Sequence, residues 1–377
     1  MQNFAKKPSL PALRRTALML GVALLTGTAQ AGELVDMLTV SGFGTIGEAH
    51  SSLKTGDYVA DVFQPNGAGY TRSSALGVDS KFALQLDLKL LDNLSAVVQL
   101  VSRNRANRNY MPTVEWANIK YAVTPELSVR LGRTAMPTFM NSETRLVGYA
   151  NPWIRPPVET YSLRSTTNSD GGDVSYRIAF GEIKSTAQAW YGKTEIATVG
   201  TTGVISNGGR ATKIIGLADT IEYGAMTLRG AVTKIDFRIT RAPGVYIFAK
   251  ANVYNLGAMY DPGDWFVMGE WTKTNFGTIQ RAQLAKYVTA GYRWKKFTPY
   301  ATYSTVAVDD DQIKLALRAQ DSKSAGIRWD FMKNTSLKVQ VDDVKLAEGS
   351  SGFFTNARPG LPGSRAKILG AAVDFVF

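Results

Sequence analysis

Regular alternation of apolar and polar residues is the feature that most restricts how this sequence can fold. The clearest case is 81–90, KFALQLDLKL, in which every second residue from Phe82 to Leu90 is apolar. Strict alternation predicts a β-strand whose two faces meet different surroundings. About sixteen segments share this texture, with boundaries good to a few residues: 37–49, 81–90, 94–103, 113–123, 127–132, 173–180, 185–194, 211–223, 226–236, 251–260, 265–273, 283–294, 297–306, 321–331, 335–345 and 364–377. The sequence therefore predicts an all-β protein.

The connections between these segments alternate in length. Short turns such as Asp92-Asn93 and Gly224-Ala225 alternate with long loops such as 50–72 and 134–165. Antiparallel strands with tight turns at one rim and long loops at the other are typical of transmembrane β-barrels. A sandwich of two sheets also alternates, but its polar face meets bulk water. Aromatic residues cluster at the strand ends, as in the interfacial girdles of membrane barrels, and this favours the barrel.

The first 31 residues have the three parts of a secretory signal peptide. Four basic residues precede the apolar run 17–25, and Ala29-Gln30-Ala31 supplies the small residues of a cleavage site. The apolar run is too short to span a bilayer, which argues against a membrane anchor. We expect a mature chain of one domain, residues 32–377, whose formal net charge falls from +12 to +8 when the leader is removed.

Composition argues against catalysis. The chain has no cysteine and one histidine, His50. A single histidine disfavours a histidine metal site, and His50-Ser51 lacks the third group that would orient a serine nucleophile. The basic residues alternate with apolar ones, which does not indicate nucleic-acid binding. We expect no enzyme activity and no cofactor.

The chain ends on an alternating aromatic strand, ILGAAVDFVF. With the signal peptide, the opening strand VSGFGTIGEA and the segment SVRLGR before a long loop, this order of features resembles the general porins of Gram-negative bacteria. The resemblance implies a barrel of sixteen strands in the outer membrane, in contact with its lipid and lipopolysaccharide, and a homotrimer. It also implies a third outer loop folded into the lumen, and recognition of Phe375 and Phe377 by the outer-membrane assembly machinery.

The segment 134–161, TAMPTFMNSETRLVGYANPWIRPPVETY, interrupts the alternation. It is much longer than an ordinary connection, so it is either functional or disordered. Four prolines exclude a central strand or an unbroken helix, whereas its aromatic and aliphatic residues argue against disorder. We expect this loop to fold into the lumen and narrow it. The candidate constriction residues on the loop are Glu143, Arg145, Trp153, Arg155 and Glu159.

Charged residues at lumen-facing strand positions form the second candidate group. By strand phase the basic wall residues are Lys81, Lys89, Arg103, Lys120, Arg130 and Arg177, with Asp87 and Asp173 opposing them. Arg133 is out of phase with Arg130. It matches the Gly-Arg that precedes the third loop in the porins, and the resemblance places it at the constriction. Charged rings and aperture width decide which solutes such pores pass. Pairing with each other or with lipopolysaccharide is the alternative role for each charge.

The expected function is a passive, water-filled channel for small hydrophilic solutes and ions. A substrate-selective channel of the same architecture stays open, with Tyr149, Trp153 and Tyr161 as a platform for one solute class. A structural or adhesive barrel with a plugged lumen also stays open. The loop has balanced charge and does not decide the ion preference, while the positive mature chain predicts a mild preference for anions.

Overall fold

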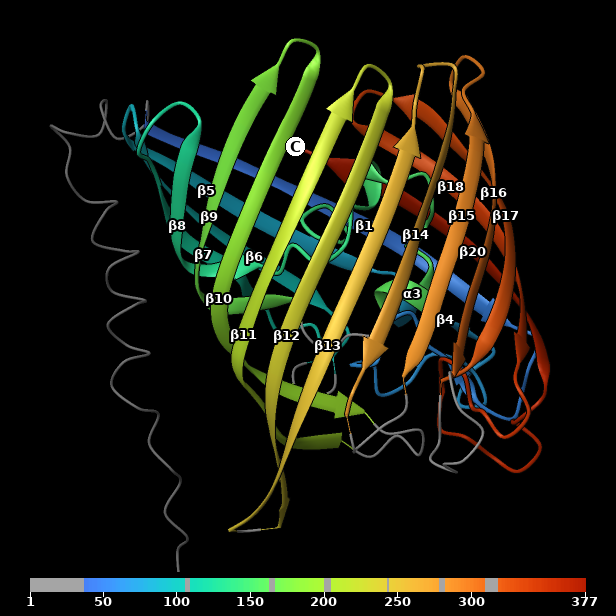
Figure 1. Ribbon diagram of the computed structural model, residues 1–377. Coiled ribbons are helices and arrows are strands. Elements are labelled where there is room, and N and C mark those ends of the chain that lie inside the picture. The colour runs from blue at the N-terminus through green and yellow to red at the C-terminus, as the bar shows by residue number, and fades with distance from the viewer. Residues whose placement is uncertain are drawn as a thin grey trace, which may run out of the picture.

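The structure, a computed structural model, describes residues 37–105, 109–162, 167–199, 205–242, 244–277, 282–308 and 318–377. The expected signal peptide, residues 1–31, lies outside the described residues. Within the described ranges no helix is long and apolar enough to cross a membrane. Long antiparallel strands form one closed sheet, because β1 pairs with β20 on one side and with β5 on the other (Figure 1).

Sixteen of the described strands build the wall, which confirms the predicted count. They are β1 (Leu38–Ser51), β5 (Lys81–Leu91), β6 (Leu94–Arg103), β7 (Thr113–Ala122), β8 (Leu127–Ala135), β9 (Asn168–Phe180), β10 (Ile183–Val199), β11 (Ile205–Tyr223), β12 (Met226–Ala242), β13 (Val245–Tyr260), β14 (Trp265–Asn275), β15 (Gln283–Tyr292), β16 (Phe297–Val308), β17 (Gln320–Met332), β18 (Thr335–Leu346) and β20 (Arg365–Val376). The hairpin of β12 and β13 projects beyond the other strands at the long-loop rim (Figure 1).

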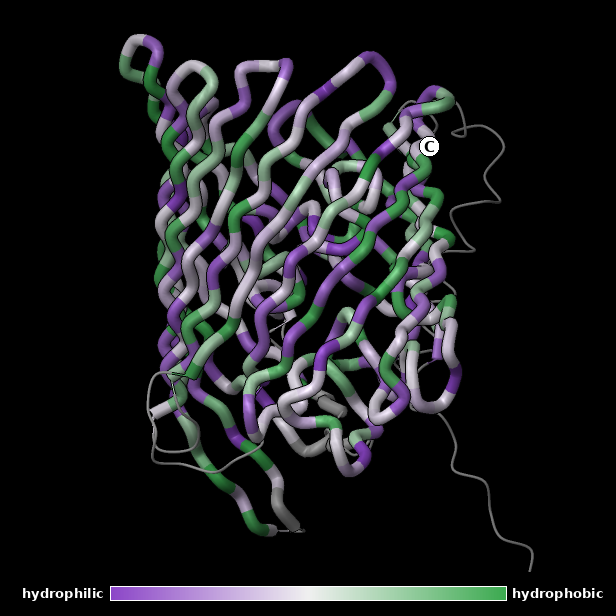
Figure 2. The backbone as a smooth tube through the Cα atoms, turned by 90° about the vertical axis from the view of Figure 1, so that its right-hand side faces the viewer, coloured by the Kyte–Doolittle hydropathy of each residue, from purple (hydrophilic) through white to green (hydrophobic). Residues whose placement is uncertain are grey.

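Apolar side chains point outward from the wall, and polar or small ones point inward. Figure 2 shows hydrophobic and hydrophilic residues alternating along the strands. Phe180 and Leu217, on the outer face, are 69% and 64% exposed. A closed wall with a mainly apolar outer surface is the arrangement of a transmembrane barrel.

Glycines permit the tight turns and the closing seam. Gly181 and Gly224 adopt φ of +58° and +54° in two-residue turns, a conformation that glycine tolerates without steric cost. At the seam between β1 and β20, Gly42 exchanges backbone hydrogen bonds with Phe377. A Cβ atom on Gly42 would lie 2.4 Å from the Phe377 ring. The absence of a side chain therefore lets the terminal ring lie against β1, stacked on Phe82.

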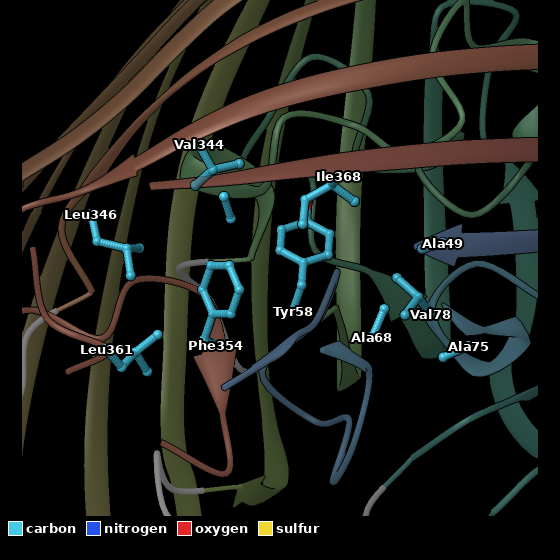
Figure 3. Packing of buried hydrophobic residues seen from close by; sticks show 11 residues of the cluster. Ala49, Tyr58, Ala68, Ala75, Val78, Val344, Leu346, Phe354, Leu361 and Ile368 are labelled. Carbon is cyan, nitrogen blue, oxygen red and sulfur yellow. The ribbon is translucent and has the colours of Figure 1, made fainter. Parts of the chain in front are cut away.

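The first and last long loops pair with each other at the long-loop end of the barrel. Strand β2 (Asp57–Tyr58) pairs with β3 (Ala68–Gly69) and with β19 (Phe354–Thr355), and the remaining short elements are β4 (Ser74–Ala75), η1 (Leu76–Val78), η2 (Gly148–Ala150) and α3 (Val158–Tyr161). Side chains of these loops pack on the inner wall, as Figure 3 shows for Tyr58 and Phe354 beside Ile368. We call this loop sheet and its apolar cluster the mouth layer. It forms an ordered layer against the wall.

Candidate pore constriction

The segment between β8 and β9 enters the barrel, as the sequence predicts. We call residues 136–162 the inner loop, and Figure 1 shows its short helix α3 inside the wall. Near its start, the Thr138 hydroxyl lies 3.2 Å from that of Thr233 on β12. At its end, the Ser162 hydroxyl donates to the Ala60 carbonyl of the first long loop. The inner loop is therefore held at both ends.

Trp153 anchors the middle of the inner loop on β15 and β16. Its side chain is 1% exposed, and its Nε1–H lies 3.1 Å from the hydroxyl oxygens of both Thr289 and Thr302. The ring meets Tyr287 edge-on, with centroids 5.9 Å apart. Buried tryptophan combines a large apolar contact with one satisfied donor.

Arg155 joins the inner loop to two buried carboxylates. Its Nε and Nη2 donate to Asp79 at 2.8 and 2.6 Å, and its Nη1 donates to Asp342 on β18 at 2.7 Å. The guanidinium also lies over the Tyr58 ring, 5.5 Å from its centroid. Fork-shaped, charge-assisted hydrogen bonds of this kind are strong and directional. Arg155 thus ties the first long loop, the inner loop and the wall together.

Glu159 is buried in a neutral polar pocket formed by β16 and β17. It accepts hydrogen bonds from Ser304 at 2.7 Å, from Gln320 at 2.6 Å and from Ser322. Burial raises the pKa of Glu159 above its usual value, and these hydrogen bonds oppose the rise only partly.

Lys338 on β18 supplies an anchor that the sequence reasoning missed. Its Nζ lies 2.7, 2.7 and 2.9 Å from the carbonyl oxygens of Gly148, Asn151 and Trp153, and 2.9 Å from Asp374. The inward phase of Lys338 in segment 335–345 was the available signal. Nothing local in the sequence indicates which carbonyl groups it meets.

These contacts correct the expected position of three loop residues. Trp153, Arg155 and Glu159 were expected to line an aperture, but all three are buried against the wall. The aromatic platform of the alternative, substrate-selective channel is also not open to solutes at Tyr161. The Tyr161 side chain is buried, and its hydroxyl donates to Glu270. Tyr149, the third member, lies beside the Arg328 guanidinium at 4.6 Å.

Glu143 and Arg145 lie on the side of the inner loop that faces β5 to β9. Glu143 is partly exposed and accepts a hydrogen bond from Arg130 Nη1 at 3.1 Å, while Arg130 Nε donates to Asp173 at 2.9 Å. Arg145 faces a small cavity that also contains Arg103. An acidic loop residue therefore does oppose a basic wall residue, at Glu143 and Arg130.

The predicted wall residues, apart from Arg133, lie at inward positions. Lys81 is opposite Thr45 and Arg103, Lys120 is opposite Arg130, and Arg177 is opposite Thr186. Lys89 lies near the short-turn rim and pairs with Asp92 at 2.8 Å. Two more inward basic residues, Lys184 and Arg229, were missed because each was read only as part of a strand. Among the described residues, Lys120, Arg177 and Lys184 form no ion pair.

The structure corrects the expected position of Arg133. It shares a face with the outward-pointing Leu131, and it lies opposite Ala117 and Asp170. Its Nε and Nη2 donate to Asp170 at 2.6 and 2.8 Å. Strand phase, which is set by the alternation of side chains, therefore places Arg133 on the outer face of the wall rather than at the inner loop.

Two groups near the cavity carry pKa shifts with electrostatic causes. Burial, followed by the charge of neighbouring Arg103, lowers the pKa of Arg105 to about 10. Burial raises the pKa of Asp61, but the guanidinium groups of Arg103, Arg145 and Arg105 outweigh it and hold that pKa below its usual range. The surroundings of the cavity are therefore strongly positive.

No family model matches the sequence, and no curated protein matches it. Solved structures do match. An anion-selective porin from Comamonas acidovorans has a TM-score of 0.59 at 13% identity, over 90% of this chain and 99% of that one. The outer membrane channel DcaP of Acinetobacter baumannii has a TM-score of 0.60 at 11% identity, over 90% and 97%. OmpF of Salmonella typhi, in complex with daunomycin, has a TM-score of 0.55 at 16% identity, over 90% and 97%. The chain thus has the sixteen-stranded antiparallel barrel fold of the porins, as predicted.

Proposed function

We propose that this protein is a passive, water-filled channel in the outer membrane of a Gram-negative bacterium. The observation that carries the proposal is the two-sided wall. Apolar residues such as Leu217 are exposed outside, while charged residues such as Lys120 and Arg177 face the interior. A polar lumen inside an apolar exterior suits the diffusion of small hydrophilic solutes and ions.

The positive net charge of the chain favours anions. Arg130 is neutralised by Asp173 and Glu143. Three inward basic residues, Lys120, Arg177 and Lys184, face the interior between the inner loop and the short-turn rim and form no ion pair among the described residues. The inward acidic residues Asp87 and Glu222 form none either. A lumen with excess positive charge concentrates anions and repels cations. One of the matched structures is described as an anion-selective porin.

Burial of Trp153 and Tyr161, two of the three platform residues, favours general diffusion over selection of one solute class. A plugged structural barrel is the second candidate, because the inner loop bonds to wall strands on several sides, from Thr233 on β12 to Asp342 on β18.

Assembly and oligomeric state belong to the same proposal. We infer recognition of Phe375 and Phe377 by the outer-membrane assembly machinery, supported by their outward positions on the terminal strand. We also infer a homotrimer, since one matched structure is a trimer form of OmpT of Vibrio cholerae.

Planar-bilayer recording tests the proposal. The purified protein should give stepwise, ohmic conductance in potassium chloride, and a salt gradient should give a reversal potential of the sign for anion preference. Saturable block by a single neutral solute would instead favour the selective channel. No conductance from correctly folded protein would refute the channel and leave the plugged barrel.

A further inference from the structure

A small cavity lies between the first long loop, the inner loop and the ends of β5 and β6. It encloses a volume of about 70 Å³. Six charged residues line it: Asp61, Asp79, Lys81, Arg103, Arg145 and Arg155. Four of these are basic and two are acidic.

Both carboxylates of this cavity already have partners. Asp79 accepts two hydrogen bonds from Arg155, and Asp61 accepts one from Arg103 Nη1 at 3.0 Å. Within the described ranges, Lys81 and Arg145 form no ion pair. The chain segments 106–108 and 163–166, which lie outside those ranges, contain no aspartate or glutamate. The residues that line the cavity therefore carry more positive than negative charge. The buried Glu115, outside the lining, offsets part of the positive charge of Arg103, Arg105 and Arg145.

Arg103 shows where a ligand would be needed. Its side chain is 10% exposed, and only Nη1 has a partner. The atoms Nε and Nη2 are buried and have no hydrogen-bond partner among the described residues. Buried donors nearly always have an acceptor, and each unsatisfied guanidinium N–H costs free energy. Two donors at adjacent corners of one guanidinium fit two oxygen atoms of a single anion.

Positive charges next to Arg103 also favour the binding of an anion in this cavity. Arg105 stacks on Phe63, with its guanidinium 4.6 Å from the ring centroid, and its Nε is also buried without a partner among the described residues. Burial and the nearby charge of Arg103 lower the pKa of Arg145, and the negative charge of Asp61 opposes this only partly. Several cations held close together are stabilised by an anion between them.

We propose that this cavity binds one small, free oxyanion of the size and shape of inorganic phosphate. Its volume of about 70 Å³ gives room for a compact ion. The Nε and Nη2 groups of Arg103 would bind two of its oxygens, and Lys81 and Arg145 would balance its charge. The inference rests on the proposed channel, through which the anion reaches the cavity. It identifies small oxyanions as a class of anion that binds inside the lumen.

Bound anion would also connect three parts of the molecule. Arg103 belongs to the wall, Arg145 to the inner loop, and Asp61 to the first long loop. An oxyanion between them would hold the loops together while it occupies the cavity. Phosphate should therefore reduce chloride current in a saturable way.

Equilibrium dialysis of the full chain in detergent against radiolabelled inorganic phosphate tests the proposal. Chloride is held constant and in large excess over phosphate, so that the ionic strength hardly changes. The wild type should bind one phosphate per chain. Arg145→Gln and Lys81→Met should each weaken binding about tenfold, the loss expected for one charge-assisted contact. Arg103→Lys, which keeps the charge that pairs with Asp61 but removes the fork, should weaken it as well. Lys286→Gln removes one charge from the outer face and serves as the matched control.

Two results would overturn the inference: no saturable phosphate binding by the wild type, or equal weakening by Lys286→Gln. Conductance in chloride alone separates this inference from the channel proposal. A protein that conducts but does not bind phosphate refutes the anion site and leaves the channel standing. A folded protein that does not conduct refutes the channel itself.

Discussion

Replacing Arg155 by methionine should release the inner loop from the wall. Arg155 is the shared partner of Asp79 and Asp342, whose side chains are 1% and 5% exposed. Methionine fills much of the space, so the main loss is electrostatic. Removing one partner from a buried ion pair costs about 3–5 kcal/mol, because the remaining charge is left uncompensated. Here two carboxylates would remain.

Hydrogen–deuterium exchange, followed by mass spectrometry, measures this loss at the inner loop. Amide groups of Thr160 and Ser162 donate within the loop, so their exchange reports on its opening. At about 1.4 kcal/mol per factor of ten, exchange of the peptide around 155–162 should accelerate by roughly two to four powers of ten. The strand peptides of β14 to β16 should keep their wild-type rates, because the ladder hydrogen bonds do not involve Arg155.

A matched variant separates charge from packing. Arg155→Met combined with Asp79→Asn and Asp342→Asn removes all three charges of this buried cluster, and most of the loop protection should return. Acceleration below about tenfold in the single variant would refute the reasoning, since it corresponds to about 1.4 kcal/mol. Equal exchange in the single and triple variants would show that charge is not what holds the loop.

Three further predictions concern the loop and the wall. The raised pKa of Glu159 means that the docked loop holds its proton more tightly than the free loop. This contribution of protonated Glu159 to loop docking is complete below pH 4.5 and is lost as pH rises through the raised pKa. The exchange protection of the inner loop in the wild type, relative to that in Glu159→Gln, should therefore fall with rising pH. Protection that changes with pH in the same way in both proteins would contradict the prediction. Arg177→Glu should move the bilayer reversal potential in the direction of cation preference, whereas Arg133→Glu on the outer face should leave it unchanged. A shift by Arg133→Glu and none by Arg177→Glu would place Arg133 in the lumen. Gly148→Ala would set a Cβ atom 2.0 Å from Asp374 Oδ1. Proteolysis of the inner loop should therefore become faster while the barrel stays folded. A variant that resists proteolysis as well as the wild type would argue against this packing of Gly148 on the wall.

The wall could be predicted because alternation is a local property of each strand. Segment 94–103 matches β6. The strands β10 to β13 extend further than predicted, to between 16 and 19 residues, because 195–210 and 237–250 were taken for loops. Beyond the apolar band both faces of the wall meet water, so the pattern fades while backbone pairing continues.

The constriction could be predicted only in part. The prolines and length of 134–161 indicated an inner loop, but its contacts join residues far apart in the chain. Arg155 lies 76 residues from Asp79 and 187 from Asp342, and no local pattern relates them. The position of Arg133, in contrast, could have been predicted from the local sequence. Its strand phase pointed outward, and the analogy with a family motif outweighed a physical signal that was correct.

The mouth layer has a consequence for the order of folding. Asn356 of the last long loop donates to Asp57 of the first at 2.7 Å, across a separation of 299 residues. Arg358 lies over Tyr70, 4.2 Å from the ring centroid, across a similar separation. Contacts between distant chain segments form slowly, because the entropy of loop closure is lost before the contacts contribute any stabilising free energy. Once β1 and β20 are paired, these two loops are neighbours and the remaining entropic cost is small. The mouth layer should therefore be the last part to order, and a fluorescent pair placed at positions 70 and 358 would report when this layer forms on the closed barrel.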